Sequence, residues 1–209
     1  MSTETEAATD TETETTSSGK PEVTIREHEL VIDEKEYTTD VYVAATVRNE
    51  GDAPSGQIKL TAKWYDADGN YLDDDDWRLR SLGTDETWAA RVYYLGGSAE
   101  EIDDYEIDGE FETEPPQTNP EGLEMVESEM NVGEDEAVIS GKVRNDRDEE
   151  VSYTEATGKI YDGEGTVLDD DWTNVTDLPA GETWAFEVKW RGRDRTEQAA
   201  DYSVWITES

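Results

Sequence analysis

Carboxylates gathered around turn residues are the feature of this sequence that most suggests chemistry. Two aspartates precede Gly69 and an aspartate run follows at 73–76, and a similar pattern returns around Gly165. Calcium takes about six to eight oxygen ligands from carboxylates and carbonyls set close together. One hypothesis is therefore a Ca²⁺ site. Its ligands would come from Asp66, Asp68, Asp73, Asp75, Asp162, Glu164, Asp169 and Asp171.

A second interpretation of the same residues needs no metal. The segments that flank the acidic turns alternate as strands do, whereas an EF-hand loop lies between helices and ends on a glutamate that is missing here. Asp and Gly adopt the backbone angles of tight hairpin turns, so the segment 66–69 reads as a turn. The aspartate runs then belong to a generally acidic surface. The sequence favours this interpretation, predicts no other cofactor, and leaves Ca²⁺ binding as an alternative.

The residues that usually carry catalysis are scarce. The chain has no cysteine and one histidine, His28, which stands between two glutamates without a nucleophile pattern beside it. No P-loop, dinucleotide fingerprint or nucleophile elbow is present. Glycosidases use a pair of carboxylates, but such a pair does not indicate a glycosidase here, because acidic residues occur throughout the chain. We therefore predict no catalytic residues, a protein that is not an enzyme, and a solvated strand position for His28.

Two tryptophans, Trp77 and Trp172, directly follow the aspartate runs. An aromatic ring beside carboxylates can form a platform for a sugar, and a large ring can equally fill a core. The surrounding segments contain few other bulky residues that could build a core. The sequence therefore favours a core position for both rings.

The charge of the chain excludes several classes of partner. There are 17 Lys and Arg residues against 55 Asp and Glu, for a formal net charge of −38. Nucleic-acid binders and proteins that dock on anionic lipid need a basic face. The 7 Trp and 10 Tyr residues nevertheless indicate a folded chain. We expect a halophilic protein that requires high salt, because molar salt shortens the Debye length to about 3 Å and screens the repulsion.

The N-terminal segment 1–21 is rich in Thr and Glu and has no signal-peptide pattern. We predict that it is disordered, either as a solubilising tail or as a spacer that holds the rest away from a cell envelope. No apolar run is long enough to span a bilayer, so we expect no membrane insertion by this chain, with any anchor absent from this sequence. Asn174 begins an N-glycosylation sequon, which adds modestly to a surface location.

The remainder of the chain repeats itself. The triplet 47–49 returns as 143–145, the segment 65–69 resembles 161–165, and the tetrapeptide 86–89 returns as 182–185, all at one spacing. Agreement in order, spacing and aromatic residues indicates two homologous units. We predict domains at 22–112 and 122–209, joined by a linker at 113–121 whose prolines favour an extended connector.

Within each repeat the apolar residues recur at every second position. Such alternation is typical of half-buried antiparallel strands. It occurs over residues 41–47, 58–64, 88–94, 137–143 and 184–190. Turn signals separate about six such segments in each repeat, which is typical of a β-sandwich. The predicted fold is all-β, with two tandem Ig-like antiparallel β-sandwiches after the acidic tail.

The two repeats carry the same short motifs at matching positions. These are Asn49, Tyr65, Asp66, Gly69, Glu86 and Thr87, and then Asn145, Tyr161, Asp162, Gly165, Gly181, Glu182 and Thr183. They resemble the FxLYD domain family, which shows an asparagine after an early strand, an L-Y-D hairpin with a following glycine, and a Gly-Glu/Asp-Thr turn before an aromatic strand. The motif's Phe is replaced by Ala62 or Gly158, and its Leu by Trp64 or Ile160. The resemblance implies an Ig-like sandwich, often found on surface or lipid-anchored proteins, without a general enzymatic activity.

Together these observations predict a non-catalytic structural or interaction module of a halophile. We expect it at the cell surface or outside the cell, presenting a sandwich to a protein or a glycan. One alternative is a Ca²⁺-binding module that uses the acidic hairpins. A second alternative is an accessory protein inside the cell, which fits the lack of a signal in the sequence as written.

Overall fold

The computed structural model describes residues 19–35, 38–97 and 99–209, so most of the predicted disordered tail lies outside the described residues. Nearly all regular secondary structure in the described residues is β-strand, which confirms the all-β prediction. The N-terminal half contains β1 (Val23–Glu34), β2 (Thr39–Asn49), β3 (Ile58–Tyr65), β4 (Tyr71–Leu79), β5 (Thr87–Tyr93) and β6 (Asp104–Phe111). The C-terminal half contains β7 (Leu123–Val132), β8 (Ala137–Asn145), β9 (Val151–Tyr161), β10 (Val167–Leu178), β11 (Thr183–Trp190) and β12 (Asp201–Glu208). Two short 3₁₀ helices, η1 (Ala99–Glu101) and η2 (Arg193–Gln198), precede the last strand of each half.

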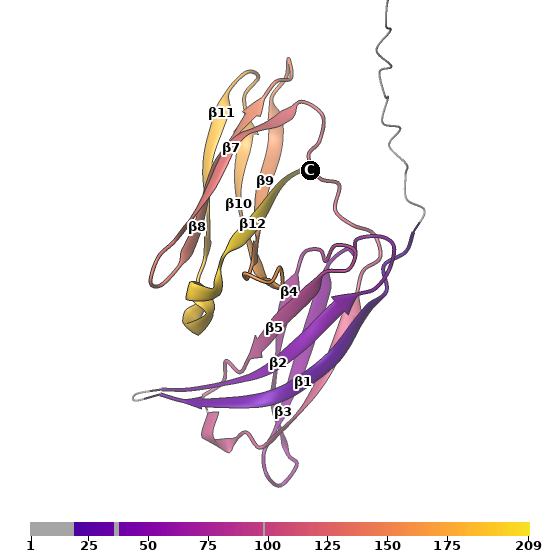
Figure 1. The fold of residues 1–209 in the computed structure, drawn as a ribbon, viewed down its shortest axis with the longest axis vertical. Coiled ribbons are helices and arrows are strands. Elements are labelled where there is room, and N and C mark those ends of the chain that lie inside the picture. Colours follow the sequence, from indigo (N-terminus) through magenta and orange to yellow (C-terminus); the bar gives the residue numbers. More distant parts are fainter. Residues whose placement is uncertain (1–18, 36–37, 98) are drawn as a thin grey trace, which may run out of the picture.

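The strands of both halves follow one plan. In the N-terminal half the order β1-β2-β5 faces the order β4-β3-β6, and in the C-terminal half the order β7-β8-β11 faces β10-β9-β12. A parallel bridge between Trp88 of β5 and Val167 of β10 joins one layer of each half into a six-stranded sheet. Figure 1 shows the two halves stacked, with the C-terminal half above the N-terminal half.

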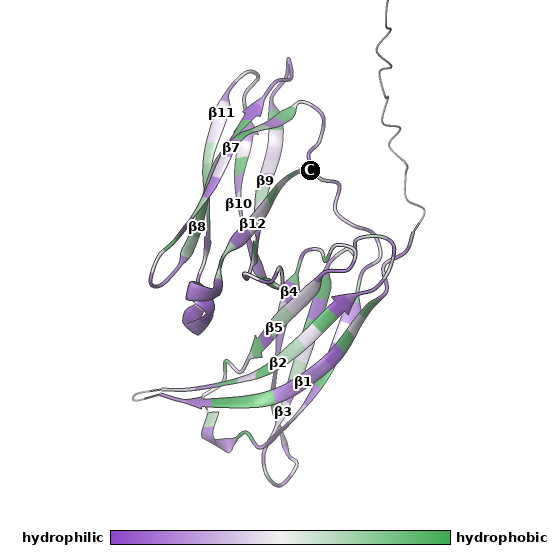
Figure 2. Ribbon diagram, viewed as in Figure 1, coloured by the Kyte–Doolittle hydropathy of each residue, from purple (hydrophilic) through white to green (hydrophobic). Residues whose placement is uncertain are grey.

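Each half encloses its own hydrophobic cluster. The N-terminal cluster is built around Trp64 and Trp88, which are both fully buried, and the C-terminal cluster includes Phe186 and Trp190. Bands of apolar and polar residues alternate along the strands in Figure 2, as the period of two in the sequence predicts. Two residues of the C-terminal half are exceptions, because Val167 of β10 belongs to the N-terminal cluster and Tyr161 of β9 packs against it.

The division into two tandem domains remains a prediction. The repeated strand order and the two clusters support it. The bridge at Val167 and the contacts described below show that the two halves are nevertheless closely associated.

The asparagine that both repeats share closes the end of each sandwich. Asn49 is fully buried, and its Nδ2 donates to the carbonyls of Leu82 and Gly83 at 3.1 Å each. Its Oδ1 accepts a hydrogen bond from the backbone N–H of Gly51 at 3.0 Å. Asn145 is also fully buried and bonds to three carbonyls of the C-terminal half. A buried amide can satisfy several loop groups at once, which explains why this residue stands at both positions.

Replacing either asparagine by alanine should therefore destabilise the protein. We expect Asn49→Ala and Asn145→Ala each to lower the free energy of unfolding by about 2–4 kcal/mol, because loop carbonyls and N–H groups lose buried partners. Urea denaturation at constant molar KCl measures the change. Asn131→Ala, at an exposed position on β7, is the matched control and should leave stability unchanged. Equal stability of all three variants would contradict this role.

Candidate functional site

A groove of about 680 Å³ lies where the two halves meet. Residues of β4 form one wall, and residues of β10 and of the end of β11 form the other. The lining consists of Gln57, Asp76, Trp77, Arg78, Arg80, Asp169, Asp170, Asp171, Trp172, Lys189, Trp190 and Arg191. We call these residues the seam groove. Three of the seven tryptophans meet here, together with four aspartates, of which Asp169 and Asp171 belong to the proposed Ca²⁺ ligands.

The predicted core position of Trp77 is wrong. Trp77 is 38% exposed, and its indole Nε1 donates to both carboxylate oxygens of Asp169, at 3.1 and 3.3 Å. Trp77 pairs with Leu60, so alternation places it on the inward row of β4. However, β4 is the edge strand of its sheet, and the ring reaches the carboxylate of the other half.

The predicted core position of Trp172 is wrong as well, for a different reason. Trp172 pairs with Thr157 on β9, in the row that faces away from the C-terminal core. It is 45% exposed, and the guanidinium of Arg80 lies 4.9 Å from the centre of its ring. Arg80 in turn forms an ion pair with Glu155 at 2.9 Å. Two large rings from different halves are thus held in place but left open to solvent.

Two aspartates expected on the acidic surface lie instead at the seam, where Asp169 is buried and Asp170 is half-buried. Asp169 accepts hydrogen bonds from Trp77 and, at 3.2 Å, from the indole of Trp190. Asp170 accepts a bond from the backbone N–H of Arg80 at 2.7 Å. Burial raises the pKa of Asp169 to about 6 and that of Asp170 to about 7, because removal from water disfavours the charged form. Both carboxyls therefore connect the two halves, which corrects the surface interpretation for these positions.

Each basic residue at the rim of the seam groove already has an acidic partner. Arg78 pairs with Asp76 at 2.7 Å and Lys189 with Glu187 at 3.0 Å. Arg191 lies 3.6 Å from Glu136. The rim therefore offers donors and acceptors side by side without an excess of one charge.

Further polar contacts fix the halves relative to each other. The ammonium of Lys159, nearly buried, pairs with Glu86 at 2.7 Å, and the hydroxyl of Tyr161 donates to the same carboxylate at 2.9 Å. Burial disfavours the charged form of Glu86, but Lys159 outweighs this and lowers the pKa of Glu86. On the other side of the six-stranded sheet, Arg195 of η2 donates to the carbonyl of Ala89 at 2.6 Å.

The carboxylates of the acidic turns hold their own backbones. Oδ1 of Asp66 accepts hydrogen bonds from the N–H groups of Asp68 and Asn70, at 2.9 and 2.8 Å. Oδ1 of Asp162 accepts the equivalent bonds from Glu164 and Thr166. Side-chain and backbone hydrogen bonds from Asn70 lower the pKa of Asp66. These turns have the arrangement that the metal-free interpretation predicts.

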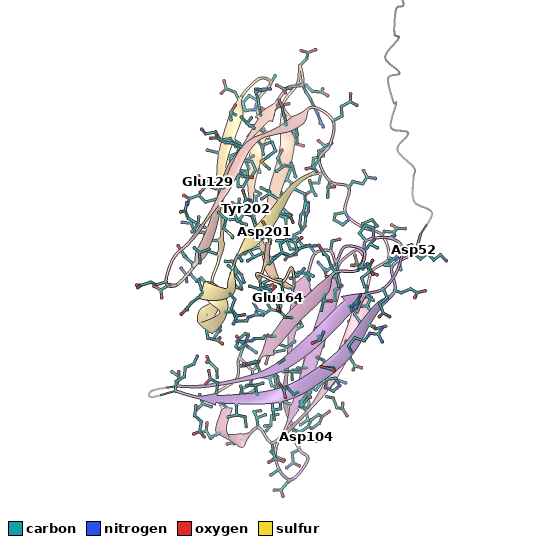
Figure 3. All side chains as sticks on the ribbon, viewed as in Figure 1. Asp52, Asp104, Glu129, Glu164, Asp201 and Tyr202 are labelled. Carbon is teal, nitrogen blue, oxygen red and sulfur yellow. The ribbon has the colours of Figure 1, made fainter. Side chains whose placement is uncertain are left out.

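The remaining residues of the proposed Ca²⁺ site are spread over the two halves. Asp75 accepts a bond from the indole of Trp64 at 2.9 Å, and Asp73 and Asp171 each accept the N–H of the next residue. Asp68 and Glu164 are exposed. Figure 3 shows Glu164 near the seam and Asp104 and Asp52 at different ends of the N-terminal half. Within residues 19–35, 38–97 and 99–209, no group of three or more potential ligands could hold a metal ion.

The two other residues that the sequence singled out lie outside the seam groove. His28 is an exposed residue of β1 whose Nδ1 is 2.7 Å from the hydroxyl of Tyr105, so its predicted strand position is confirmed. Asn174 is exposed on β10.

Sequence reasoning missed Arg80, Lys159, Trp190 and Arg195, which hold the seam together. The signal that could have found Arg195 is a difference between the repeats. The second repeat has the charged segment 193–195 before its last strand, where the same spacing places Gly97, Ser98 and Ala99 in the first repeat. A charged segment that only one repeat carries at an equivalent position indicates a contact that only this repeat makes.

Comparisons with known proteins give only distant likenesses. No protein-family model matches the chain, and no curated protein matches it. Among solved structures, a calcium-binding mutant of Bacteroides uniformis beta-glucuronidase 2 is 18% identical over 77% of this chain, with a TM-score of 0.23. Red sea bream transglutaminase is 10% identical over 88%, with a TM-score of 0.26 and 31% of its own chain covered. The C-terminal globular domain of a Pyrococcus abyssi oligosaccharyltransferase is 9% identical over 90%, with a TM-score of 0.23 and 47% covered.

The chain spans 23% of the length of that beta-glucuronidase. Likenesses at these TM-scores carry no argument about the activity of this protein. In the part of the chain that the structure describes, no helix combines the length and apolar character needed to cross a membrane.

The buried acids predict how stability depends on pH. The pKa values of Asp169 and Asp170 are raised above the ordinary value of 3.8, so the folded protein holds protons that the unfolded chain releases. The stability they contribute is fully present below about pH 4 and is lost as pH rises from there through the folded pKa values of about 6 and 7. We expect this contribution to lower the Tm at constant molar KCl between pH 4 and pH 7, and Asp170→Asn to flatten the decline. Asp68→Asn, at an exposed turn, should keep the wild-type profile, and an unchanged profile in Asp170→Asn would contradict the assignment.

Calcium should leave the protein unchanged. Oδ1 of Asp66 and Oδ1 of Asp162 each accept two N–H groups of their own turn, so a cation would compete with those bonds. We expect the same Tm with and without millimolar CaCl₂ at constant ionic strength. A ligand that binds only the folded state must raise stability, so a clear rise in Tm would support the calcium-binding alternative. Loss of that rise in Asp66→Asn would then assign it to this turn.

Proposed function

We propose that the chain is a non-catalytic interaction module of a halophile, displayed at the cell surface, that binds a partner in the seam groove. The observation that carries this proposal is the pair Trp77 and Trp172. Two exposed aromatic rings, one from each half, line a single groove. A cluster of large exposed apolar groups in a concave site is typical of a binding surface.

The seam groove is firmly held without a ligand, which suits a binding site. Asp169 fixes the indole of Trp77, and Arg80 covers one side of Trp172 while paired with Glu155. A site whose side chains are already ordered loses little conformational entropy when a partner arrives.

The proposal that the site is not catalytic rests on the partners of its acids. Raised pKa values in a groove are often a sign of acid–base catalysis. Here, however, burial between the halves accounts for the shifts, and the oxygens of Asp169 and Asp170 accept N–H groups of the protein itself. These hydrogen bonds connect the two halves, which gives both carboxyls a role in the structure.

The surface location and the salt requirement are supported by composition. A net charge of −38 suits molar salt, where repulsion between carboxylates is screened. The sequon residue Asn174 is exposed on β10, where a glycan can be attached without disturbing the core. The acidic N-terminal segment fits a spacer that separates the two halves from an envelope.

Binding to envelope material tests the proposal directly. We expect the purified chain to co-sediment with washed envelopes of a halophile in molar KCl, and Trp172→Ala to reduce the retained fraction severely. Trp172 lies outside both cores, so this variant should fold normally. Tyr71→Ala removes an aromatic residue that is 53% exposed but lies outside the seam groove, and it should be retained like the wild type.

Two results would contradict the proposal. Equal retention of Trp172→Ala and the wild type would show that the seam groove is not the binding site. Recovery of the native, unmodified protein from the cytosol alone would favour the accessory protein inside the cell, and its partners should then be sought there.

A further inference from the structure

The seam groove combines ring faces with paired polar groups in a way that fits one class of ligand. Trp77 and Trp172 present large apolar faces, and the rim supplies carboxylates such as Asp76 beside guanidinium groups such as Arg78. A pyranose ring has an apolar C–H face and hydroxyls that both donate and accept hydrogen bonds. Such a ring can stack on an indole while its hydroxyls bond to acids and bases at the edge.

The charges around the groove favour a neutral ligand over a charged one. Arg78, Arg80, Lys189 and Arg191 all lie within ion-pairing distance of carboxylates of the protein. An anionic ligand would have to compete with those carboxylates and approach a chain with a net charge of −38. A cationic ligand would lose most of its attraction at molar salt. Stacking and short hydrogen bonds persist under those conditions, and a neutral, hydroxyl-rich ligand uses both.

The dimensions of the groove agree with a short chain of sugar rings. Its volume of about 680 Å³ falls in the range of roughly 300–1,000 Å³ that is typical of small-molecule sites. The two rings come from β4 and β10, on opposite walls, so a ligand that touches both bridges the two halves.

We infer that the seam groove binds a neutral oligosaccharide, whose pyranose rings stack on Trp172 and Trp77. This inference rests on the proposed function, because it names the ligand class of the same groove. Trp172 is the principal stacking surface, and Trp77 is the second contact on the opposite wall. The hydroxyls bond to Asp76, Arg78 and the neighbouring rim residues.

Titration with defined sugars tests the inference. The probes are short neutral oligosaccharides of β-linked glucose, xylose or mannose, added to the full chain in molar KCl. We expect at least one to bind saturably at micromolar to millimolar concentration and to shift the indole N–H resonances of Trp172 and Trp77. Trp172→Ala should weaken binding by about tenfold or more, as truncation of a central aromatic contact does. Trp172→Phe should retain part of the affinity, and Tyr71→Ala should bind like the wild type.

The outcomes separate this inference from the function on which it rests. One outcome is that no neutral oligosaccharide binds, that envelopes still retain more wild type than Trp172→Ala, and that protease treatment of the envelopes abolishes this retention. The ligand is then a protein, so this inference is wrong while the proposed function stands. Tighter binding of a matched galacturonate oligomer would overturn the neutral ligand. Newly formed reducing ends would contradict the non-catalytic part of the proposed function and leave the ligand class supported. Absence of both sugar binding and envelope retention would overturn both.

Discussion

The arrangement of this protein depends on one buried carboxylate between its two halves. Asp169 accepts the indole N–H of Trp77 from the N-terminal half and that of Trp190 from its own half. An unpaired buried charge is very unfavourable, so these donors are essential to its place at the seam. The same bonds orient Trp77 toward the groove. The seam groove therefore depends on Asp169 of β10, which supplies the hydrogen-bond acceptor for the indole of Trp77 on the edge strand β4 of the other half.

The halves share a plan but use equivalent residues differently. The aspartate run of β4 lies on an edge strand, whereas the matching run of β10 lies against the other half and is buried in part. η2 adds an asymmetric contact, because Arg91 of β5 pairs with Asp194 at 2.7 Å and Arg195 reaches the backbone of β5. A duplicated sequence thus builds two similar sandwiches, and a few differences between the copies determine how they associate.

The elements of the fold were predictable from the sequence, and the seam was not. Alternation is a local property, so it identified β2, β3, β5, β8 and β11. The position of Trp172 on the outward row also follows from alternation, once the register of β10 with β9 is known. The exposure of Trp77 does not, because it depends on β4 being an edge strand beside Asp169. Contacts between halves are set by packing over long sequence distances, which no local pattern encodes.

Several of the few Lys and Arg residues of this chain lie where the two halves meet. Only 17 residues are Lys or Arg, and in the described chain Arg80, Arg91, Lys159, Arg193 and Arg195 all make polar or ionic contacts between the halves. At molar salt an exposed ion pair contributes little, whereas a pair that is shielded from solvent, such as Lys159 with Glu86, is screened much less. Lys and Arg side chains placed between the halves therefore form ion pairs that salt screens least. The proposed function accordingly assigns recognition to the tryptophans, whose stacking does not depend on charge.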